Sequence, residues 1–186
     1  MTRLGRWQPA TPEERLDRLE SLAEIQQLPH RYAVALDSRD MDALVALFAP
    51  DVRVGRDTRG RDALAAWFST TMREMRTSIH FTANHVVDFD DADHAQGIVY
   101  CRDQLERPDR GTWEIGDLQY WDTYVRAEGE WCFERRRFLR YYMVDALERP
   151  SHGAGVGEGH DALATTQLPE AFESWHRFWG EGDAPS

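Results

Sequence analysis

The sequence predicts an α+β fold in which helices from the N-terminal part of the chain cover one face of an antiparallel β-sheet. Residues 11–75 carry apolar side chains at the three- and four-residue spacing of amphipathic helices. Residues 78–144 form four long strand-like runs, separated by the turn signals DAD, RPDRG and EGE. Because these connections are short, we expect an antiparallel meander. Helices followed by a meander are typical of the α+β class.

The first predicted helix begins at Thr11, which is followed by a proline at the first helical position and by Glu14 three residues after the cap. This is the pattern of a capping box. Apolar residues then recur at helical spacing as far as Leu36. Pro29 is expected to kink or break the helix, and Ser21 begins a second capping-box pattern. The segment is therefore predicted to form one kinked helix or two helices.

The elements that follow are shorter. Asp40 is the predicted N-cap of a helix over residues 41–49, which Pro50 ends. A short strand is expected at residues 52–55, and a further helix over residues 61–75. With the meander, these elements predict a curved antiparallel sheet that has the helices on its concave face.

The chain is predicted to divide into an α+β domain at residues 1–147 and a tail at residues 148–186. The tail starts with a glycine-rich stretch that has the composition of a linker. It continues with LPEAFESWHRFW, in which Phe172, Trp175 and Trp179 suit one helical face. We expect this helical tail to fold back onto its own domain or onto a neighbouring chain.

Composition excludes several classes of function. The 186 residues suffice for one domain with a substantial core, and the net charge of -11 disfavours nucleic acid and anionic membranes as partners. All 22 basic residues are arginine, so Schiff-base catalysis and a Walker A phosphate loop are excluded. Cys101 and Cys132 lack metal-ligand spacing. We expect a cytoplasmic protein that binds a small-molecule substrate and needs no metal or cofactor.

The predicted strand SIHFTANHVVDFD contains two histidines, His80 and His85. Because side chains alternate along a strand, the odd spacing predicts that they point to opposite faces of the sheet. His85 falls in an apolar row, which predicts a hydrogen-bonded, partly buried histidine. His80 falls in a polar row with Asn84, which faces either solvent or a polar cavity.

A curved sheet with helices on its concave face leaves a wedge-shaped cavity between the two layers. The first helix offers Tyr32 and Asp37 to this space, and the sheet offers His80 and Arg136. Trp113 and Trp121 share a strand face and are candidates, with Asn84, for substrate contact, although core packing accounts for the tryptophans equally well.

The segments AEIQQLPHRYAVALDSRDMDALVALFAPDV and SIHFTANHVV resemble the SnoaL-like branch of the nuclear transport factor 2 superfold. This cone-shaped, cystatin-like fold also includes scytalone dehydratase, ketosteroid isomerase and hexachlorocyclohexane dehydrochlorinase. The resemblance covers about residues 20–146 and implies an Asp–His dyad at Asp37 and His80, with Arg136 nearest to an arginine of the dehydrochlorinase. That enzyme has a lysine where this chain has Tyr32, which argues against the same substrate. Tyr32 is similar in residue type to the tyrosines that polarise a carbonyl oxygen in relatives.

Two main functions compete on these residues, and a third, an epoxide hydrolase or polyketide cyclase, would require a carboxylic acid as the principal cavity group, which Asp37 could supply without His80. In the first, His80 is a general base, Asp37 orients it and Tyr32 or Arg136 stabilises developing charge. The protein would then be a cofactor-independent lyase or isomerase that acts on a small, largely apolar cyclic or carbonyl-bearing molecule. In the second, it is a non-catalytic ligand-binding or assembly subunit, like the small subunit of aromatic-ring dioxygenases. In either case a homodimer or homotrimer is expected, because the sheet face with Tyr120 and Tyr124 needs cover.

Overall fold

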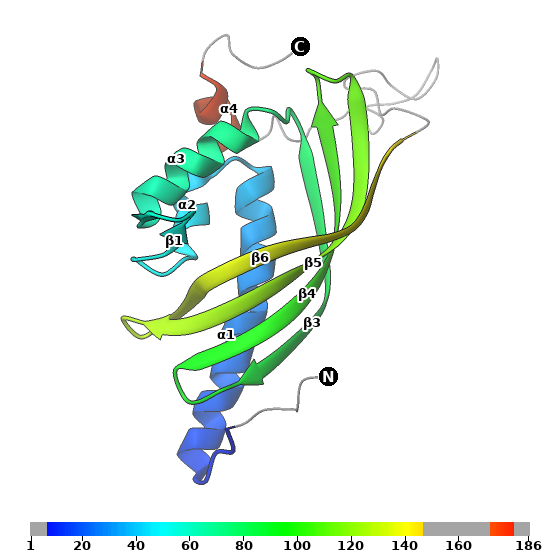
Figure 1. Cartoon of the computed structure of the whole chain (residues 1–186). Coiled ribbons are helices and arrows are strands. Elements are labelled where there is room, and N and C mark those ends of the chain that lie inside the picture. The colour runs from blue at the N-terminus through cyan, green and yellow to red at the C-terminus, as the bar shows by residue number, and fades with distance from the viewer. Residues whose placement is uncertain (1–6, 147–171, 181–186) are drawn as a thin grey trace.

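The computed structural model of the chain describes residues 7–146 and 172–180, and in it a strongly curved sheet crosses one long helix (Figure 1). The elements in chain order are α1 (Pro12–Asp37), α2 (Met41–Ala46), β1 (Arg53–Val54), β2 (Thr58–Arg59), α3 (Arg61–Met72), β3 (Ser78–Phe89), β4 (His94–Arg107), β5 (Thr112–Ala127), β6 (Glu130–Asp145) and α4 (Glu173–Trp179). The predicted α+β class with a curved antiparallel sheet is confirmed. α2 and α3 end earlier than expected, and β2 forms an unpredicted small hairpin with β1.

The long helix α1 is continuous through its internal proline. It begins with the predicted capping box at Thr11. Pro29 lies inside the helix and is buried against the core, so packing of the apolar stripe offsets the backbone hydrogen bond that proline cannot donate. Ser21 is not a cap, because α1 runs through it without interruption, and its hydroxyl accepts a hydrogen bond from Arg126 at 2.6 Å. The prediction of a break or second helix start in this segment is therefore wrong.

The sheet is the predicted meander, with the antiparallel order β3-β4-β5-β6. One bulge in β3 changes which residues share a face. Thr82 pairs with Cys101 and His85 pairs with Val99, so β3 advances three residues while β4 advances two. The extra residue reverses the alternation of β3 beyond this point.

The bulge places His80 and His85 on the same, concave face of the sheet. His80 pairs with Asp103, whose side chain is buried on that face, and His85 bonds the buried Tyr124. The prediction that the two histidines point to opposite faces is therefore wrong. Regular alternation failed because Asn84 is part of the bulge and is exposed.

Two bulges in β6 decide which of its side chains point inward. The register with β5 shifts between Asp117 and Leu118 and again between Thr123 and Tyr124. As a result, Arg136 and Arg140 lie on the concave face, where each reaches a buried aspartate of β5 or β4.

The core lies between α1 and the concave face, closed at one end by α2, α3 and α4 (Figure 1). Trp175 and Trp179 of α4 are buried, and Ser174 donates a hydrogen bond to the Ser38 carbonyl at 2.7 Å. The tail helix thus folds back onto its own chain beside the C-terminal end of α1. The expected linker between the domain and this helix lies outside the described residues up to residue 171. Within the described residues, no helix is both long enough and apolar enough to span a bilayer.

Candidate active site

The C-terminal end of α1 and the start of β3 bring Asp37 and His80 into direct contact. His80 Nδ1 lies 2.6 Å from Asp37 Oδ1, and the backbone N–H of His80 donates to Asp37 Oδ2 at 2.8 Å. One carboxylate therefore holds both the backbone and the ring of the histidine. The hydrogen bond expected between these residues is confirmed.

The partners of the His80 ring define its useful tautomer. An ionised carboxylate only accepts hydrogen bonds, so Nδ1 carries the proton that faces Asp37 and Nε2 carries the free lone pair. Nε2 has no hydrogen-bond partner among the described residues, and only 6% of the His80 side chain is exposed. The ring is thus fixed by the protein through Nδ1, while its other nitrogen makes no hydrogen bond to a described residue.

A buried arginine that the sequence analysis did not select supports the pair. Arg39 Nη1 donates to Ser78 Oγ at 2.7 Å, and the Ser78 hydroxyl donates to Asp37 Oδ1 at 2.9 Å. Arg39 follows the helix cap with a φ of 59°, a left-handed conformation that usually favours glycine at this position. Burial lowers the pKa of Arg39 to about 10, and the charge of Asp37 opposes this change.

The structure places Tyr32 and Arg136 in a packed aromatic cluster. Four rings surround Tyr32 with centroid separations of 5.7 to 6.3 Å, so this part of the expected wedge between the layers is filled. Burial raises the pKa of Tyr32 to about 12. The guanidinium carbon of Arg136 lies 4.3 Å from the centroid of the Tyr32 ring. No hydrogen bond joins either residue to Asp37 or His80 in the described part of the chain.

Arg136 is held by a separate polar network. Its guanidinium donates to both carboxylate oxygens of Asp122, at 2.9 and 2.7 Å. Tyr124 donates to Asp122 at 3.0 Å, and His85 Nε2 lies 3.0 Å from the Tyr124 hydroxyl. Burial lowers the pKa of His85 to about 4, against the opposing charge of Asp122. The prediction of a hydrogen-bonded, partly buried His85 is confirmed.

The structure does not bring the three predicted substrate contacts to His80. Trp121 is 43% exposed and alternates with Tyr120 and Asp122, which are buried on the concave face. Trp113 has the same parity and therefore also lies on the outer face, where its indole N–H donates to Gln104. Asn84 is exposed in the β3 bulge. None of the three residues therefore lies beside His80 as expected. The two tryptophans share one face of β5, as predicted, but this is the outer face, whereas His80 lies on the concave face.

Asp103 lies in the place that these residues were expected to occupy. It pairs with His80 across β3 and β4, is only 2% exposed, and its Oδ1 atom has no hydrogen-bond partner in the described structure. Its signal in the sequence is parity: in β4 it alternates in step with Val99, Cys101 and Leu105, which are all buried. An aspartate in an apolar row is a departure that could have identified it.

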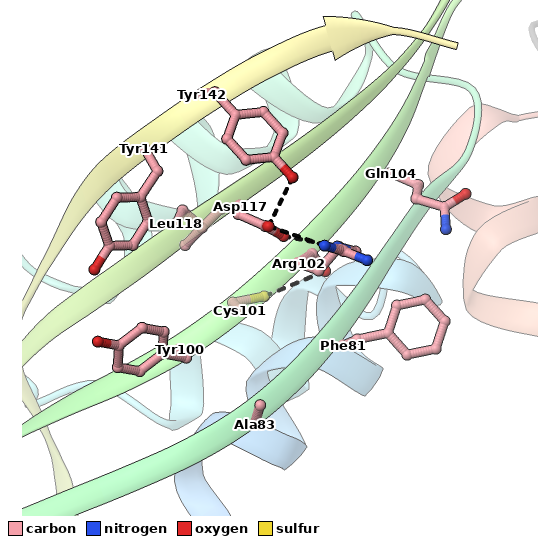
Figure 2. Close-up of a pocket in the computed structure, with 10 residues that line it drawn as sticks. All are labelled: Phe81, Ala83, Tyr100, Cys101, Arg102, Gln104, Asp117, Leu118, Tyr141 and Tyr142. Atoms are coloured by element: carbon pink, nitrogen blue, oxygen red, sulfur yellow. Dashed lines mark hydrogen bonds and ion pairs between the residues drawn. The ribbon is translucent and has the colours of Figure 1, made fainter. Parts of the chain in front are cut away.

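A hollow of about 850 Å³ lies on the outer face of the sheet (Figure 2). Phe81, Tyr100, Tyr141 and Tyr142 contribute rings to its lining. Asp117 lies between two partners there, and accepts hydrogen bonds from Arg102 at 2.7 and 2.9 Å and from the Tyr142 hydroxyl at 2.7 Å. The hollow faces away from α1 and from the Asp37–His80 pair.

Comparison with solved structures supports the same fold. A candidate scytalone dehydratase from Novosphingobium aromaticivorans is 24% identical, with a TM-score of 0.63 over 73% of this chain and 93% of that one. A type 2 hexachlorocyclohexane dehydrochlorinase is 22% identical, with a TM-score of 0.66 over 77% of this chain and 99% of that one. An NTF2-like protein with a cystatin-like fold, also from Novosphingobium aromaticivorans, is 26% identical, with a TM-score of 0.58 over 74% and 92% of the two chains.

No curated protein matches the chain. The family model of the SnoaL-like domain matches residues 17–137, which include most of α1, the Asp37–His80 pair and the arginine at position 136. With a matching fold and a family model that covers most of the chain, this protein belongs to the SnoaL-like family.

Proposed function

We propose that the protein is a cofactor-independent lyase or isomerase of the elimination type, in which His80 is the general base and Asp37 orients it. The observation that carries this proposal is that Asp37 bonds both the backbone N–H and Nδ1 of His80, which leaves Nε2 without a hydrogen-bond partner among the described residues. The names of two structural neighbours, a dehydratase and a dehydrochlorinase, describe eliminations and support the same reaction class.

In this mechanism, His80 Nε2 removes a proton from a carbon beside a carbonyl group or a leaving group. The imidazolium that forms is stabilised by the adjacent Asp37 carboxylate. General base catalysis of this kind contributes about 100- to 10,000-fold to the rate. The proposed substrate is small, largely apolar and cyclic or carbonyl-bearing. Tyr32 and Arg136 support the fold in this proposal and have no catalytic role. Tyr32 packs within the aromatic cluster, and Arg136 is hydrogen-bonded to Asp122.

Elimination from two simple cyclic ketones tests the proposal. Both 3-hydroxycyclohexanone and 3-chlorocyclohexanone give 2-cyclohexenone, whose ultraviolet absorbance reports the rate. We expect His80→Gln to lower kcat by at least about 100-fold, because the base is lost. Asp37→Asn should have a similar effect, because the amide does not enforce the tautomer with a free Nε2 lone pair. Neither substitution removes core volume, so the melting temperature should change by only a few degrees.

The chain offers a matched control for this experiment. His94 and Asp91 form a second histidine–aspartate pair at 3.0 Å, but it is exposed in the turn before β4. His94→Gln should leave the rate unchanged. Full activity in His80→Gln would contradict the catalytic assignment and favour a ligand-holding role for the protein.

A further inference from the structure

The two carboxylates buried on the concave face of the sheet have very different surroundings. Asp122 is fully paired, with two hydrogen bonds from Arg136 and one from Tyr124. Asp103 has only Arg140, whose Nη2 lies 3.6 Å from Oδ2, which is longer than a hydrogen bond. Its other oxygen has no partner among the described residues. Arg140 is therefore a long ion-pair partner for one oxygen of Asp103, while the other oxygen of this buried carboxyl group lacks a hydrogen bond, which is costly.

The strands on either side make room for this carboxyl group beside the proposed base. Asp103 pairs with His80 on β3, and directly opposed residues on one face have Cβ atoms about 4.5–5.5 Å apart. On its other side it pairs with Gly116, where a Cβ atom would overlap Asp103 Oδ1. The terminal methyl group of Met143 in β6 would lie 3.2 Å from a Cβ atom at Gly116. The glycine leaves the gap that the carboxyl fills, and a flexible side chain covers it.

The surroundings of Asp103 shift the pKa of its carboxyl group upward. Burial raises the pKa of its carboxyl group, while His80 and Arg140 act in the opposite direction. The other titratable groups that face it are Cys101 and Tyr120, whose neutral forms burial also favours. A buried carboxyl group with a raised pKa and one oxygen that lacks a hydrogen bond lies opposite His80 on the same sheet face, which is the arrangement of a candidate acid and base pair.

We propose that Asp103 is the general acid of this site and donates its proton to the leaving oxygen of a hydroxyl-bearing substrate while His80 accepts a proton from carbon. The inference rests on the proposed function of His80. The C–H bond breaks as Nε2 takes the proton, its electron pair forms the C=C bond, and the C–O bond breaks. The leaving hydroxyl takes the Asp103 proton and departs as water. His80 then returns its proton to the Asp103 carboxylate, so no oxidant or cofactor is consumed.

This role selects the class of substrate. A hydroxyl group is a poor leaving group and benefits from protonation, whereas chloride leaves as a stable anion without it. The site is therefore suited to the removal of water from a β-hydroxy carbonyl compound. Removal of hydrogen halide would need His80 and Asp37 alone.

The protonation state of Asp103 can be measured without a substrate. In the full chain labelled with ¹³C at the aspartate carboxyl carbons, the resonance lost in Asp103→Asn belongs to Asp103. We expect this resonance to titrate at higher pH than those of the exposed aspartates. The melting temperature of Asp103→Asn at neutral pH should equal that of the unchanged protein, because the amide mimics a neutral acid. A resonance that titrates with the exposed carboxyls would overturn the proposal.

The two cyclohexanones test the catalytic step. Asp103→Asn should slow loss of water from 3-hydroxycyclohexanone by about 100-fold or more, and should change loss of chloride from 3-chlorocyclohexanone by no more than about threefold. Asp117→Asn is the matched control, because Asp117 adjoins Gly116 on the same sheet but points to the outer face. It should leave both rates unchanged.

The inference and the proposed function fail in different ways. If His80→Gln abolishes both reactions but Asp103→Asn keeps the rate of water loss, the acid role of Asp103 is wrong and the base role of His80 stands. Equal slowing of both reactions by Asp103→Asn would also contradict the acid role. If the unchanged protein eliminates from neither ketone, or His80→Gln keeps both rates, the proposed function fails and the inference that depends on it fails too.

Discussion

At the scale of single residues, the site contains some side chains that the sequence identifies and others that are recognised only from their contacts in the folded structure. Asp37 and His80 were predictable because both residue types suit proton transfer and the family resemblance marks both positions. Arg39, Ser78 and Asp103 were not, because their relation to the pair depends on the packing of α1 on β3 and on the β3–β4 register. Without knowledge of its spatial neighbours, an aspartate in the sequence is equally consistent with a turn or with a solvent-exposed surface.

His85 gives a residue-scale prediction about pH. In the unfolded chain its imidazole has the ordinary histidine pKa of about 6.5, whereas burial lowers the pKa in the folded state to about 4. Between these values the unfolded state binds more protons, so this contribution to stability is lost as the pH falls from about 6.5 to about 4. We expect the free energy of unfolding of the unchanged protein to fall by about 1 kcal/mol more than that of His85→Gln between pH 7 and pH 5, after allowance for partial exposure.

Urea unfolding at the two pH values measures this difference. The exposed His94 is the control, since its pKa is raised by its hydrogen bond to Asp91 and its contribution has the opposite sign. Equal pH dependence in the unchanged protein and His85→Gln would show that His85 titrates normally in the folded state.

At the scale of elements, bulges rather than average alternation decide which side chains meet. The β3 bulge brings His85 to the face of His80, and the β6 bulges bring Arg136 and Arg140 inward. They also leave Tyr141 and Tyr142 both exposed on the outer face. A period of two predicts strands but cannot locate an inserted residue, because a bulge is set by pairing with the neighbouring strand.

Removal of the β3 bulge tests this effect. Deletion of Asn84 would restore regular alternation and turn the buried Phe89 toward the outer face. We expect a loss of unfolding free energy of at least about 3 kcal/mol, the usual cost of removing a buried phenylalanine from a core. Urea denaturation measures it. The control Asn84→Ala keeps the chain length at an exposed position and should change stability by no more than about 0.5 kcal/mol. Similar stability of the two variants would contradict the structural role of the bulge.

At the scale of the whole molecule, the outer face of the sheet is a broad apolar surface that the other described elements leave uncovered. Tyr120 and Tyr124 were expected on this face, but both are buried in the core. The exposed apolar side chains are instead Phe81, Val86, Tyr100, Trp121, Tyr141, Tyr142 and Val144, and several of them surround the hollow in Figure 2. The expected partner for this surface is a second copy of the chain, because the Arg102–Asp117 pair leaves the patch locally neutral on an acidic protein.

Sedimentation at micromolar concentration tests self-association through this face. We expect a mass of two or three times 21.6 kDa for the unchanged protein. Tyr141→Arg should shift it toward 21.6 kDa, because it places a charge in the centre of the apolar patch. Trp67→Arg is the control, since Trp67 is also exposed but belongs to α3. A single 21.6 kDa species for the unchanged protein would contradict self-association.

Local sequence signals were sufficient to predict the α+β class, the meander and the starts of α1, α2 and α3, because periodicity and capping residues are properties of a linear sequence. Asp37 and His80 were identified as a pair through the family resemblance. The tertiary structure alone decided that Pro29 stays inside one helix, that His85 shares a face with His80, and that Asp103 rather than Asn84 adjoins the pair. Core packing outweighed a local helix-breaking preference, and strand register, which depends on residues far apart in the chain, selected the neighbours of His80.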